Sequence, residues 1–536
     1  MYITILKRNK IMRGMAMRRV IKCLILSILL ILLTSCSFFG KDIDFLPMQK
    51  EEGNEIELTE LKDNSITVGL VSVDTFNPFK TTSVTVRDML GFIYEPLFSI
   101  NPDLTTTGVL AHSYEQSHNG MSLKINLKNG VKWHDGTEFT ANDVVYTINE
   151  IKKTPCRYSK LCDLITSASI INSYALNIEF SRPMSNLPAL LSFPVIKSGS
   201  GETTDLKPVG TGPFAYDNDN DTLTAFNKYH GSKAKIDSIK IKRIKDNEKF
   251  TSLFSASVLD AASYEMLKGQ SYVPKSNAKT YECISNNMVY VGFNNASTVF
   301  KYDEARRSVS KLIDRRNIVT HIYFSKAVEA MYPCNPQSRF YPEGAVSLRS
   351  DITGAQAELD NNGWEMDKSG IFNRRDALSV TYFTVNLLVN ADNENRVLAA
   401  EKISSVMADA GMKCNVIKCS PSEFSARINA GNYDMFIGES ELLPNNDLTE
   451  LLYSSGNIFN YSNNDVDNML SQLGTLTSEE DVKKAWAKLY ETLIEECPIA
   501  PICFTKNEVV TSARVKSGVA PSVEGTFRET ENWSLE

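Results

Sequence analysis

The sequence predicts an α/β protein with more than one domain, and three observations support that fold class. The chain has 536 residues, enough to bury a large core and to divide into domains, and its composition is ordinary for a globular protein. Residues 121–154 combine alternating and helical hydrophobic patterns in one short stretch. Residues 394–438 alternate between predicted helices and strands, which is typical of an α/β lobe.

The stretch 121–154 is well specified by its own residues. Its first residues alternate between apolar and polar, as in a half-buried strand, and Asn129 and Gly130 then supply a tight turn. A second, shorter alternation and another turn follow. Thr140 stands three residues before Asp143, which predicts a capped helix N-terminus, and apolar residues then recur at helical spacing. We therefore predict a strand, a hairpin and a capped helix.

The second half of the chain predicts helices and strands in turn. An amphipathic helix is expected over 394–410, followed by a strand at 413–418. Ser420 then caps a helix, and a strand follows at 433–438. A long helix is predicted over about 478–496, and it leads into a further strand. This order favours a lobe built from layers of helices on a sheet.

The N-terminal 35 residues have the pattern of an export signal. Seven basic residues and no acidic residue come first, and residues 21–33 are almost wholly apolar. That run is too short to span a bilayer comfortably as a permanent helix. The ending Leu-Thr-Ser-Cys resembles a bacterial lipobox, which would make Cys36 the acylated mature N-terminus. An uncleaved membrane anchor is the alternative, and both place the remainder outside the cytoplasm.

The charge of the mature chain argues against some partners. Removing residues 1–35 takes away seven basic side chains and lowers the formal net charge from −7 to −14. Nucleic acids and anionic membrane surfaces need basic patches, so we expect neither as a partner. The balance is compatible with cationic or amine-bearing ligands. Residues 36–64 are acidic and aperiodic and are predicted to be a tether.

No catalytic or metal site is predicted. The chain has no zinc-protease, nucleophile-elbow or phosphate-loop motif, and its five histidines are scattered. His134 and Asp135 lie at a predicted hairpin tip, so we interpret them as turn residues and not as a catalytic pair. The Gly-Thr-Gly-Pro of residues 210–213 is interpreted as a tight turn. We expect no cofactor and no enzymatic activity.

Cysteine spacing leaves the disulfides open. No Cys-x-x-Cys or nearby histidine completes a metal-ligand set, so metal binding is not expected. Cys414 and Cys419 would point to opposite faces of one strand, which argues against a bond between them. Eight cysteines remain after the signal and Cys36: Cys156, Cys162, Cys283, Cys334, Cys414, Cys419, Cys497 and Cys503.

Several segments together resemble the bacterial extracellular solute-binding proteins of family 5, which serve oligopeptide, dipeptide and nickel ABC importers. The most specific is LKNGVKWHDGTEFTANDVVYTI at residues 127–148. Shorter matches are the Asn-Pro loop at 77–78, the Tyr-Glu-Pro-Leu at 94–97, the Pro-Val-Gly-Thr-Gly-Pro-Phe at 208–214 and the Leu-Ile-Asp-Arg-Arg at 312–316. The matches occur in the family's order along nearly the whole mature chain.

The resemblance implies a two-lobed periplasmic-binding-protein-like fold, type II, of the large cluster, with an extra subdomain in the first lobe. Two crossing strands would join the lobes, and the cleft between them would close on ligand. The expected divisions are a signal at 1–35, a tether at 36–64, lobe I at 65–288 plus 505–536 with its extra subdomain at 91–203, and lobe II at 289–504.

The resemblance also implies a function. It indicates a monomeric lipoprotein on the outer face of the bacterial cytoplasmic membrane, anchored through Cys36. This receptor would capture short peptides and deliver them to the transmembrane subunits of an ABC permease. The alternatives left open are a receptor for another solute, such as chelated nickel, a sugar or an opine-like compound, and a receptor that senses a peptide without importing it.

Candidate ligand-binding residues lie mainly after the strand at 433–438. Peptide binders of this family typically hold the ligand's amine with a carboxylate there. Glu439 stands where the family has a tryptophan, so the resemblance leaves Glu439, Glu441 and Asp447 as candidate amine anchors. Asn294 and Asn295, near the predicted hinge, are candidates to bond the backbone of an extended ligand. Solvent-facing acids and a structural turn are the alternative interpretations.

Overall fold

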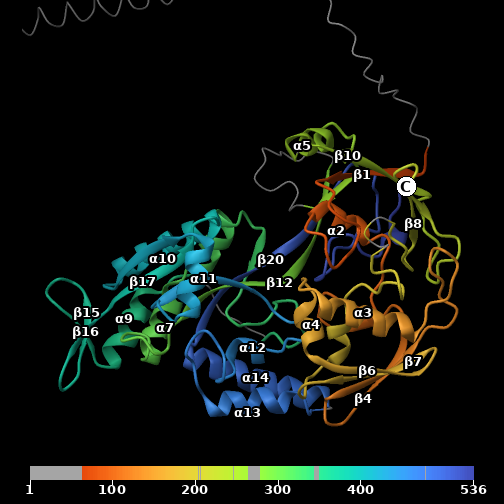
Figure 1. Cartoon of the computed structure of the whole chain (residues 1–536). Helices are drawn as coiled ribbons and strands as arrows, with labels where there is room; N and C mark the ends of the chain where they lie inside the picture. The colour runs from red at the N-terminus through yellow and green to blue at the C-terminus, as the bar shows by residue number, and fades with distance from the viewer. Residues whose placement is uncertain are drawn as a thin grey trace, which may run out of the picture. The chain divides into compact units, whose positions relative to one another are not determined.

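The structure is a computed structural model, and its main sheet runs through both halves of the molecule (Figure 1). It describes residues 63–202, 205, 207–245, 247–263, 278–342, 349–476 and 478–535. The predicted export signal, Cys36 and nearly all of the predicted tether lie outside the described residues. Within the described part, no helix is long and apolar enough to cross a membrane.

The main sheet has 11 strands in the described part, in the order β18-β17-β19-β12-β20-β11-β1-β10-β9-β8, with β13 beside β20. Its strands are β1 (Ser65–Val71), β8 (Phe214–Asp217), β9 (Thr222–Ala225), β10 (Ser238–Ile244), β11 (Ala261–Ser263), β12 (Lys279–Phe293), β13 (Ala327–Glu329), β17 (Thr384–Asn390), β18 (Lys413–Cys419), β19 (Met435–Glu441) and β20 (Ile499–Thr511).

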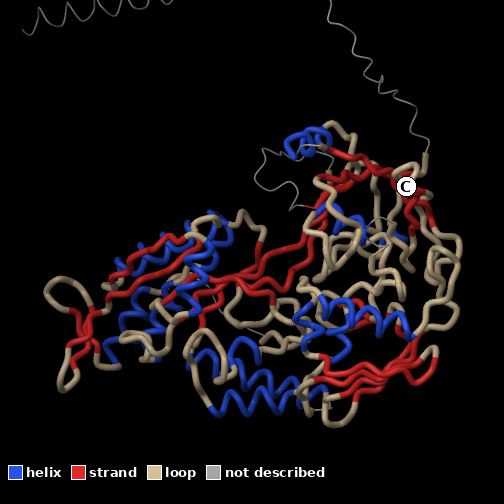
Figure 2. The backbone as a smooth tube through the Cα atoms, viewed as in Figure 1, coloured by secondary structure: helices blue, strands red, loops and turns tan. Residues whose placement is uncertain are grey.

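Two long antiparallel strands, β12 and β20, connect the two ends of this sheet (Figure 2). One end of β20 pairs with β11, and the last half of β12 pairs with β19. The β12–β20 pairing is interrupted twice, between Ile284 and Met288 and between Val289 and Tyr290. Regular pairing therefore holds each end of the ribbon, and its middle is irregular.

Smaller sheets and helices surround the main sheet. A two-stranded sheet pairs β2 (Phe98–Ile100) with β3 (Thr106–Gly108). A four-stranded sheet has the order β4 (Ala111–Gln116), β5 (Ser122–Leu127), β7 (Ala175–Phe180), β6 (Ile165–Asn172). A three-stranded sheet consists of β14 (Trp364–Met366), β15 (Phe372–Arg375) and β16 (Val380–Tyr382). The helices are α2 (Val84–Leu90), α3 (Ala141–Lys153), α4 (Ser159–Asp163), α5 (Asn247–Ser255), α7 (Asp303–Leu312), α8 (Arg315–Asn317), α9 (Ile352–Asn361), α10 (Glu394–Asp409), α11 (Pro421–Asn429), α12 (Thr449–Leu452), α13 (Asn464–Leu473) and α14 (Glu479–Glu496), with short 3-10 turns at Leu187–Leu191 and Thr530–Asn532 and a π turn at Ile318–Ile322.

The end of β12 is apolar on both faces because it lies between two cores. Val289, Val291 and Phe293 belong to one buried cluster, whereas Met288 and Tyr290 belong to another. Successive side chains of a strand point to opposite faces, so a continuous apolar run is what a central strand needs. Helix α10 covers β17 and β18 on one side of this region.

The stretch 121–154 folds largely as predicted. Strand β5 and helix α3 are present, and the backbone N–H of Thr140 donates to Asp143 Oδ2 at 2.8 Å in a capping box. The second alternation, at residues 131–133, was predicted to extend the strand pattern and does not. It makes one bridge, between Lys132 and Glu138, because the chain reverses at once around residues 134–137.

His134 joins this turn to a distant glycine segment. The N–H of Gly210 donates to His134 Nδ1 at 3.2 Å, and the ring's Nε2 lies 2.9 Å from the carbonyl oxygen of Gly212. The imidazole is therefore neutral, with its proton on Nε2, and burial lowers its pKa. Asp135 pairs with Lys197 instead. These contacts favour the interpretation of both segments as structural turns.

We expect the folding stability to fall as the pH is lowered from about 7 to 5, partly through His134. Its pKa is depressed in the folded protein, so the unfolded chain takes up the proton first, near its ordinary pKa of about 6.5. Thermal unfolding of wild type and a His134→Gln variant across this range checks the prediction. The variant should show a smaller decline; an equal decline would assign the pH dependence to other groups.

Candidate ligand-binding cleft

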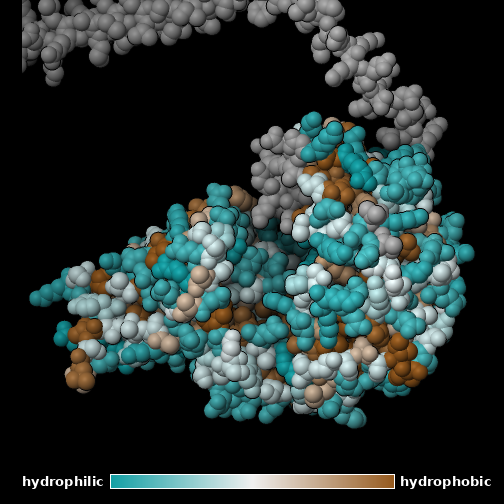
Figure 3. Space-filling view, viewed as in Figure 1, coloured by the Kyte–Doolittle hydropathy of each residue, from teal (hydrophilic) through white to brown (hydrophobic). Residues whose placement is uncertain are grey.

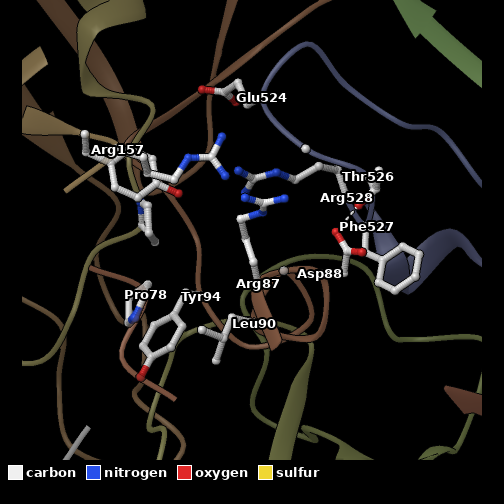
Figure 4. A pocket seen from close by; sticks show the side chains of 14 residues that line it. Pro78, Arg87, Asp88, Leu90, Tyr94, Arg157, Glu524, Thr526, Phe527 and Arg528 are labelled. Atoms are coloured by element: carbon white, nitrogen blue, oxygen red, sulfur yellow. Dashed lines mark hydrogen bonds between the residues drawn. The ribbon is translucent and has the colours of Figure 1, made fainter. Parts of the chain in front are cut away.

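A small, charged cavity of about 50 Å³ lies where helix α2, the α3–α4 loop and the C-terminal segment meet (Figure 4). Helix α2 begins at its cap Ser83, whose side chain accepts from the N–H of Val86, and it places Arg87 and Asp88 at the cavity. The lining residues are Pro78, Arg87, Asp88, Leu90, Gly91, Tyr94, Arg157, Tyr158, Pro194, Glu524, Gly525, Thr526, Phe527 and Arg528.

The C-terminal segment is held firmly against α2. The hydroxyl of Thr526 donates to Asp88 Oδ1, and Phe527 packs on the buried rings of Phe92 and Trp533. A side chain on Gly91 would lie 2.3 Å from the carbonyl oxygen of Phe527, so a glycine permits this close approach. The shape of the cavity is thus maintained by contacts between the C-terminal segment and the buried core, and not by one loop alone.

Three arginines dominate the electrostatics of the cavity. Figure 4 shows the guanidinium groups of Arg87, Arg157 and Arg528 pointing toward one another. Glu524 lies beside them, and its Oε1 is buried without a hydrogen-bond partner among the described residues. Burial raises the pKa of Glu524 to about 7, although Arg528 and Arg157 act in the opposite direction. The cavity is therefore suited to an anion.

Glu441 comes from the other side of the cleft. Strand β19 carries Glu439 and Glu441 on one face, and both are exposed. The phenol of Tyr158 raises the pKa of Arg157, burial lowers it, and the carboxylate of Glu441 raises it further. Figure 3 shows the molecular surface hollowed between the part that carries α10 and α11 and the part that carries α2.

Glu439 has an arginine partner of its own. Its carboxylate lies 3.4 Å from a guanidinium nitrogen of Arg396, the third residue of α10. Ser440, between the two glutamates, points the other way and lies 3.2 Å from the hydroxyl of Tyr290. Glu439 and Glu441 are thus presented on a rigid strand, where a carboxylate can be aimed precisely.

Asp447 contacts other residues and lies outside the arginine cavity. It makes an ion pair with Arg182, and its Oδ1 accepts from the N–H of Thr449 at 2.8 Å. Nearby, the side-chain amide of Asn445 donates to the carbonyl oxygen of Ser185 at 3.2 Å. Asp447 does not line the arginine cavity. Its contacts join the segment after β19 to the segment after β7.

Asn294 and Asn295 make turn contacts at the end of β12. The amide of Asn294 donates to the carbonyl oxygen of Tyr433 at 2.9 Å, and its Oδ1 accepts from the N–H of Ala296 at 3.1 Å. The amide of Asn295 donates to the carbonyl oxygen of Phe459 at 3.1 Å, and its Oδ1 is buried without a partner among the described residues. The structure thus places both away from the arginine cavity.

The arginine cavity was missed by sequence reasoning. Arg87, Arg157 and Arg528 are far apart in the chain, and none belongs to a motif. The described residues contain no group of three or more His, Cys, Asp or Glu side chains that could hold a metal ion. All eight cysteines of the described part are free, including Cys414 and Cys419 of strand β18.

Comparison with known proteins finds relatives whose names describe peptide transport or binding. The chain is similar to the peptide transport periplasmic protein SapA of Haemophilus influenzae, with 26% identity over 502 residues, 79% of this chain and 85% of the relative. It is also similar to the oligopeptide-binding protein AppA of Bacillus subtilis, with 22% identity over 519 residues, 90% of this chain and 93% of the relative.

The fold has matches among solved structures. NikZ of Campylobacter jejuni, in complex with Ni(L-His), matches with a TM-score of 0.63 and 19% identity, over 88% of this chain and 99% of that one. The two-lobed α/β fold of the periplasmic solute-binding proteins is therefore shared. The family model described as bacterial extracellular solute-binding proteins, family 5, middle region, matches residues 105–459. This chain therefore belongs to family 5 of the bacterial extracellular solute-binding proteins.

Proposed function

We propose that this protein is the receptor of an ABC importer for short peptides. The observation that carries the proposal is the presence of opposite charges in the cleft, namely the arginine cavity beside α2 and the exposed carboxylate of Glu441 on β19. Glu441 on β19 supplies a carboxylate for a ligand amine, and Arg157 lies on the other side within its electrostatic reach. A peptide in water has one positive and one negative end, so this arrangement complements both. The peptide-binding names of the SapA and AppA relatives support it.

Ligand capture would use the β12–β20 ribbon as a hinge. The β12–β20 pairing is interrupted around residues 284–290, and from Asn287 onward β12 stays paired with β19, so bending is expected at residues 285–286. The ends of the ribbon are regularly paired, so each half would move as a rigid body. Closing would bring β19 toward the arginine cavity and remove water from the ligand, which strengthens both charge interactions.

Delivery would occur at the membrane. The export signal and the lipobox-like ending at Cys36 support an anchored receptor outside the cytoplasm, where the permease subunits of the importer would receive the ligand. Asp447 and its ion pair with Arg182 would hold neighbouring segments in register as the cleft closes. Glu439, Asn294 and Asn295 remain candidate ligand contacts in this proposal.

Calorimetric titration of the mature protein with di- to hexapeptides tests the proposal. We expect micromolar or tighter binding with little dependence on the internal sequence, because main-chain contacts supply the affinity. A Glu441→Gln variant should bind about tenfold more weakly, since a charge-assisted contact to the ligand's amine is lost.

An exposed acid far from the cleft serves as the control. Glu365, on strand β14 of the small sheet at the far left of Figure 1, can be changed to glutamine and should leave affinity unchanged. Native mass spectrometry of freshly purified protein adds an unbiased readout of what co-purifies. A protein that binds no peptide but retains a metal chelate or a sugar would contradict the proposal and favour a receptor for another solute.

A further inference from the structure

We propose that the arginine cavity, formed by Arg87, Arg157 and Arg528 with Glu524 and Asp88, binds a compact ligand group that carries two negative charges. An acidic carboxyl-terminal residue of a peptide has this chemistry, and so does a phosphate group. The inference rests on the proposed function, because it names the class of peptide that the cleft selects. It adds that the receptor prefers peptides whose carboxyl-terminal end carries two negative charges.

The charge balance of the cavity calls for an anion. Within the described residues, neither Arg157 nor Arg528 makes a side-chain hydrogen bond or an ion pair within 4 Å. Asp88 already accepts from the hydroxyl of Thr526. Glu524 is the remaining acid, and burial keeps it partly protonated near neutral pH. Arg157 and Arg528 therefore bring two guanidinium charges into the cavity without ion pairs of their own among the described residues, and an anion offsets their mutual repulsion.

The size of the cavity limits the occupant to an end group. A volume of about 50 Å³ is space for about three or four water molecules on this scale. A carboxylate or a phosphate fits that space, whereas a large side chain or a peptide segment does not. Arginine is also the side chain best suited to planar, bidentate recognition of these groups. The cavity thus binds the end group of a ligand whose remainder lies in the cleft.

The position of the cavity agrees with this role. The phenol of Tyr158 and, less strongly, the carboxylate of Glu441, the candidate amine anchor on β19, raise the pKa of Arg157. Arg157 is exposed to solvent, although Glu441, Glu524 and Asp88 all lie within its electrostatic reach. A side chain that is both accessible and surrounded by charged groups can bind a ligand without a large rearrangement.

Titration of the mature protein with matched tripeptides tests the proposal. The probes are Ala-Ala-Glu, Ala-Ala-Ala and the amide Ala-Ala-Ala-NH₂, with inorganic phosphate as a separate arm. We expect affinity to fall about tenfold from Ala-Ala-Glu to Ala-Ala-Ala and again to the amide, because each step removes one charge-assisted contact. In an Arg157→Gln/Arg528→Gln variant, the three peptides should bind with nearly equal affinity.

An Arg375→Gln variant is the control, since Arg375 is exposed on β15, outside the cavity lining. It should keep the full preference for Ala-Ala-Glu. Thermal unfolding of each variant shows that it is folded before titration. If wild type binds all three peptides equally, the inference is overturned and the proposed function stands.

Two further outcomes separate the inference from the proposed function. If phosphate binds the wild type but not the double variant, and no peptide binds, the cavity is an anion site and the peptide function fails. If neither peptides nor phosphate bind, both fail. Tight binding of phosphate to the double variant would place the anion elsewhere and overturn the inference.

The pH dependence gives a second readout. The groups that act on Glu524 are Arg528, the hydroxyl of Ser192, the backbone N–H of Ile100 and Arg157. Raising the pH from 6 to 8 ionises Glu524, adds a negative charge to the cavity and should weaken Ala-Ala-Glu binding several-fold. A Glu524→Gln variant should show a smaller decline and keep the tight binding, because only the peptide's α-amino group, with a pKa of about 8, then loses charge over this range. Affinity that rises with pH in the wild type would contradict the assignment.

Discussion

Replacing Gly210 with alanine is expected to destabilise the folded protein by about 3 kcal/mol or more. A Cβ atom on this residue would lie 1.9 Å from the carbonyl oxygen of Ile93, which is far inside van der Waals contact. The backbone cannot simply shift away, because the N–H of Gly210 donates to His134 Nδ1 and its carbonyl oxygen accepts from the N–H of His134. The backbone of Ile93 on one side and the bonds to His134 on the other therefore prevent the chain from relieving the clash.

The neighbouring Gly212 is constrained in the same way. Its N–H donates to the carbonyl oxygen of Ile93 at 2.8 Å, and a Cβ there would lie 2.6 Å from that oxygen. The Gly-Thr-Gly segment is thus packed against the backbone of residues 92–93, directly before the Tyr-Glu-Pro-Leu segment. Glycine is required at both positions because a Cβ atom would clash with the backbone of residues 92–93, and not because the segment binds phosphate.

Chemical denaturation followed by tryptophan fluorescence measures the effect. Gly525→Ala is the control, since the added Cβ would meet only the Arg528 side chain, at 3.6 Å, in an ordinary backbone conformation. It should change the free energy of unfolding by less than about 1 kcal/mol. Unchanged stability of Gly210→Ala would show that residues 92–93 can move at little cost.

Replacing Arg315 with methionine is the second substitution for which we expect a large effect, about 3 to 5 kcal/mol. The residue is only 4% exposed, and burial lowers its pKa to about 10, so it remains charged at neutral pH. Its Nε donates to the carbonyl oxygens of Pro501 at 2.7 Å and Ala330 at 3.1 Å. Its Nη1 and Nη2 donate to the carbonyl oxygen and hydroxyl of Ser310, both at 3.0 Å.

Methionine has a similar volume but donates no hydrogen bond. The substitution would leave several buried carbonyl oxygens unsatisfied, and the contacts among the end of α7, strand β13 and strand β20 would be lost together. A lysine in place of Arg315 should rescue little of the stability, because an ammonium cannot reproduce the fixed geometry of the guanidinium donors.

The adjacent arginine is a matched control. Arg316 lies on the same short helix, is exposed and makes one surface ion pair with Glu329 at 3.2 Å. Arg316→Met should cost less than about 1 kcal/mol. Equilibrium unfolding in urea compares the two variants. Equal stability of both would show that the carbonyl groups around Arg315 find water or other donors.

The elements predicted from local patterns were found with small differences in their bounds. Helix α10, strand β18 and helix α14 match the predicted ranges closely, and Ser420 caps α11 by accepting from the N–H of Glu423 at 3.3 Å. Periodicity and caps depend on residues within one or two turns of each other, so the sequence displays them directly. The short alternation at 131–133 failed because a turn left no room for a second strand.

Charged side chains were harder to place, because their roles depend on distant partners. Asp447 was one of three candidate amine anchors, and in the structure it makes an ion pair with Arg182, 265 residues away in the chain. Arg87, Arg157 and Arg528 meet in one cavity although no pattern links them. A charge is stabilised by whatever lies beside it in space, and sequence neighbours do not supply that information.

The sequence by itself determined the family, the α/β elements and the order in which they follow, because hydrophobic period, turn glycines and helix caps are local properties. The tertiary structure decided which of these segments meet. Only the fold brings the turn at His134 to Gly210 and Gly212, and only the fold closes the C-terminal segment on α2. The physical reason is that the arginine cavity and the opposing Glu441 exist through contacts between parts of the chain hundreds of residues apart.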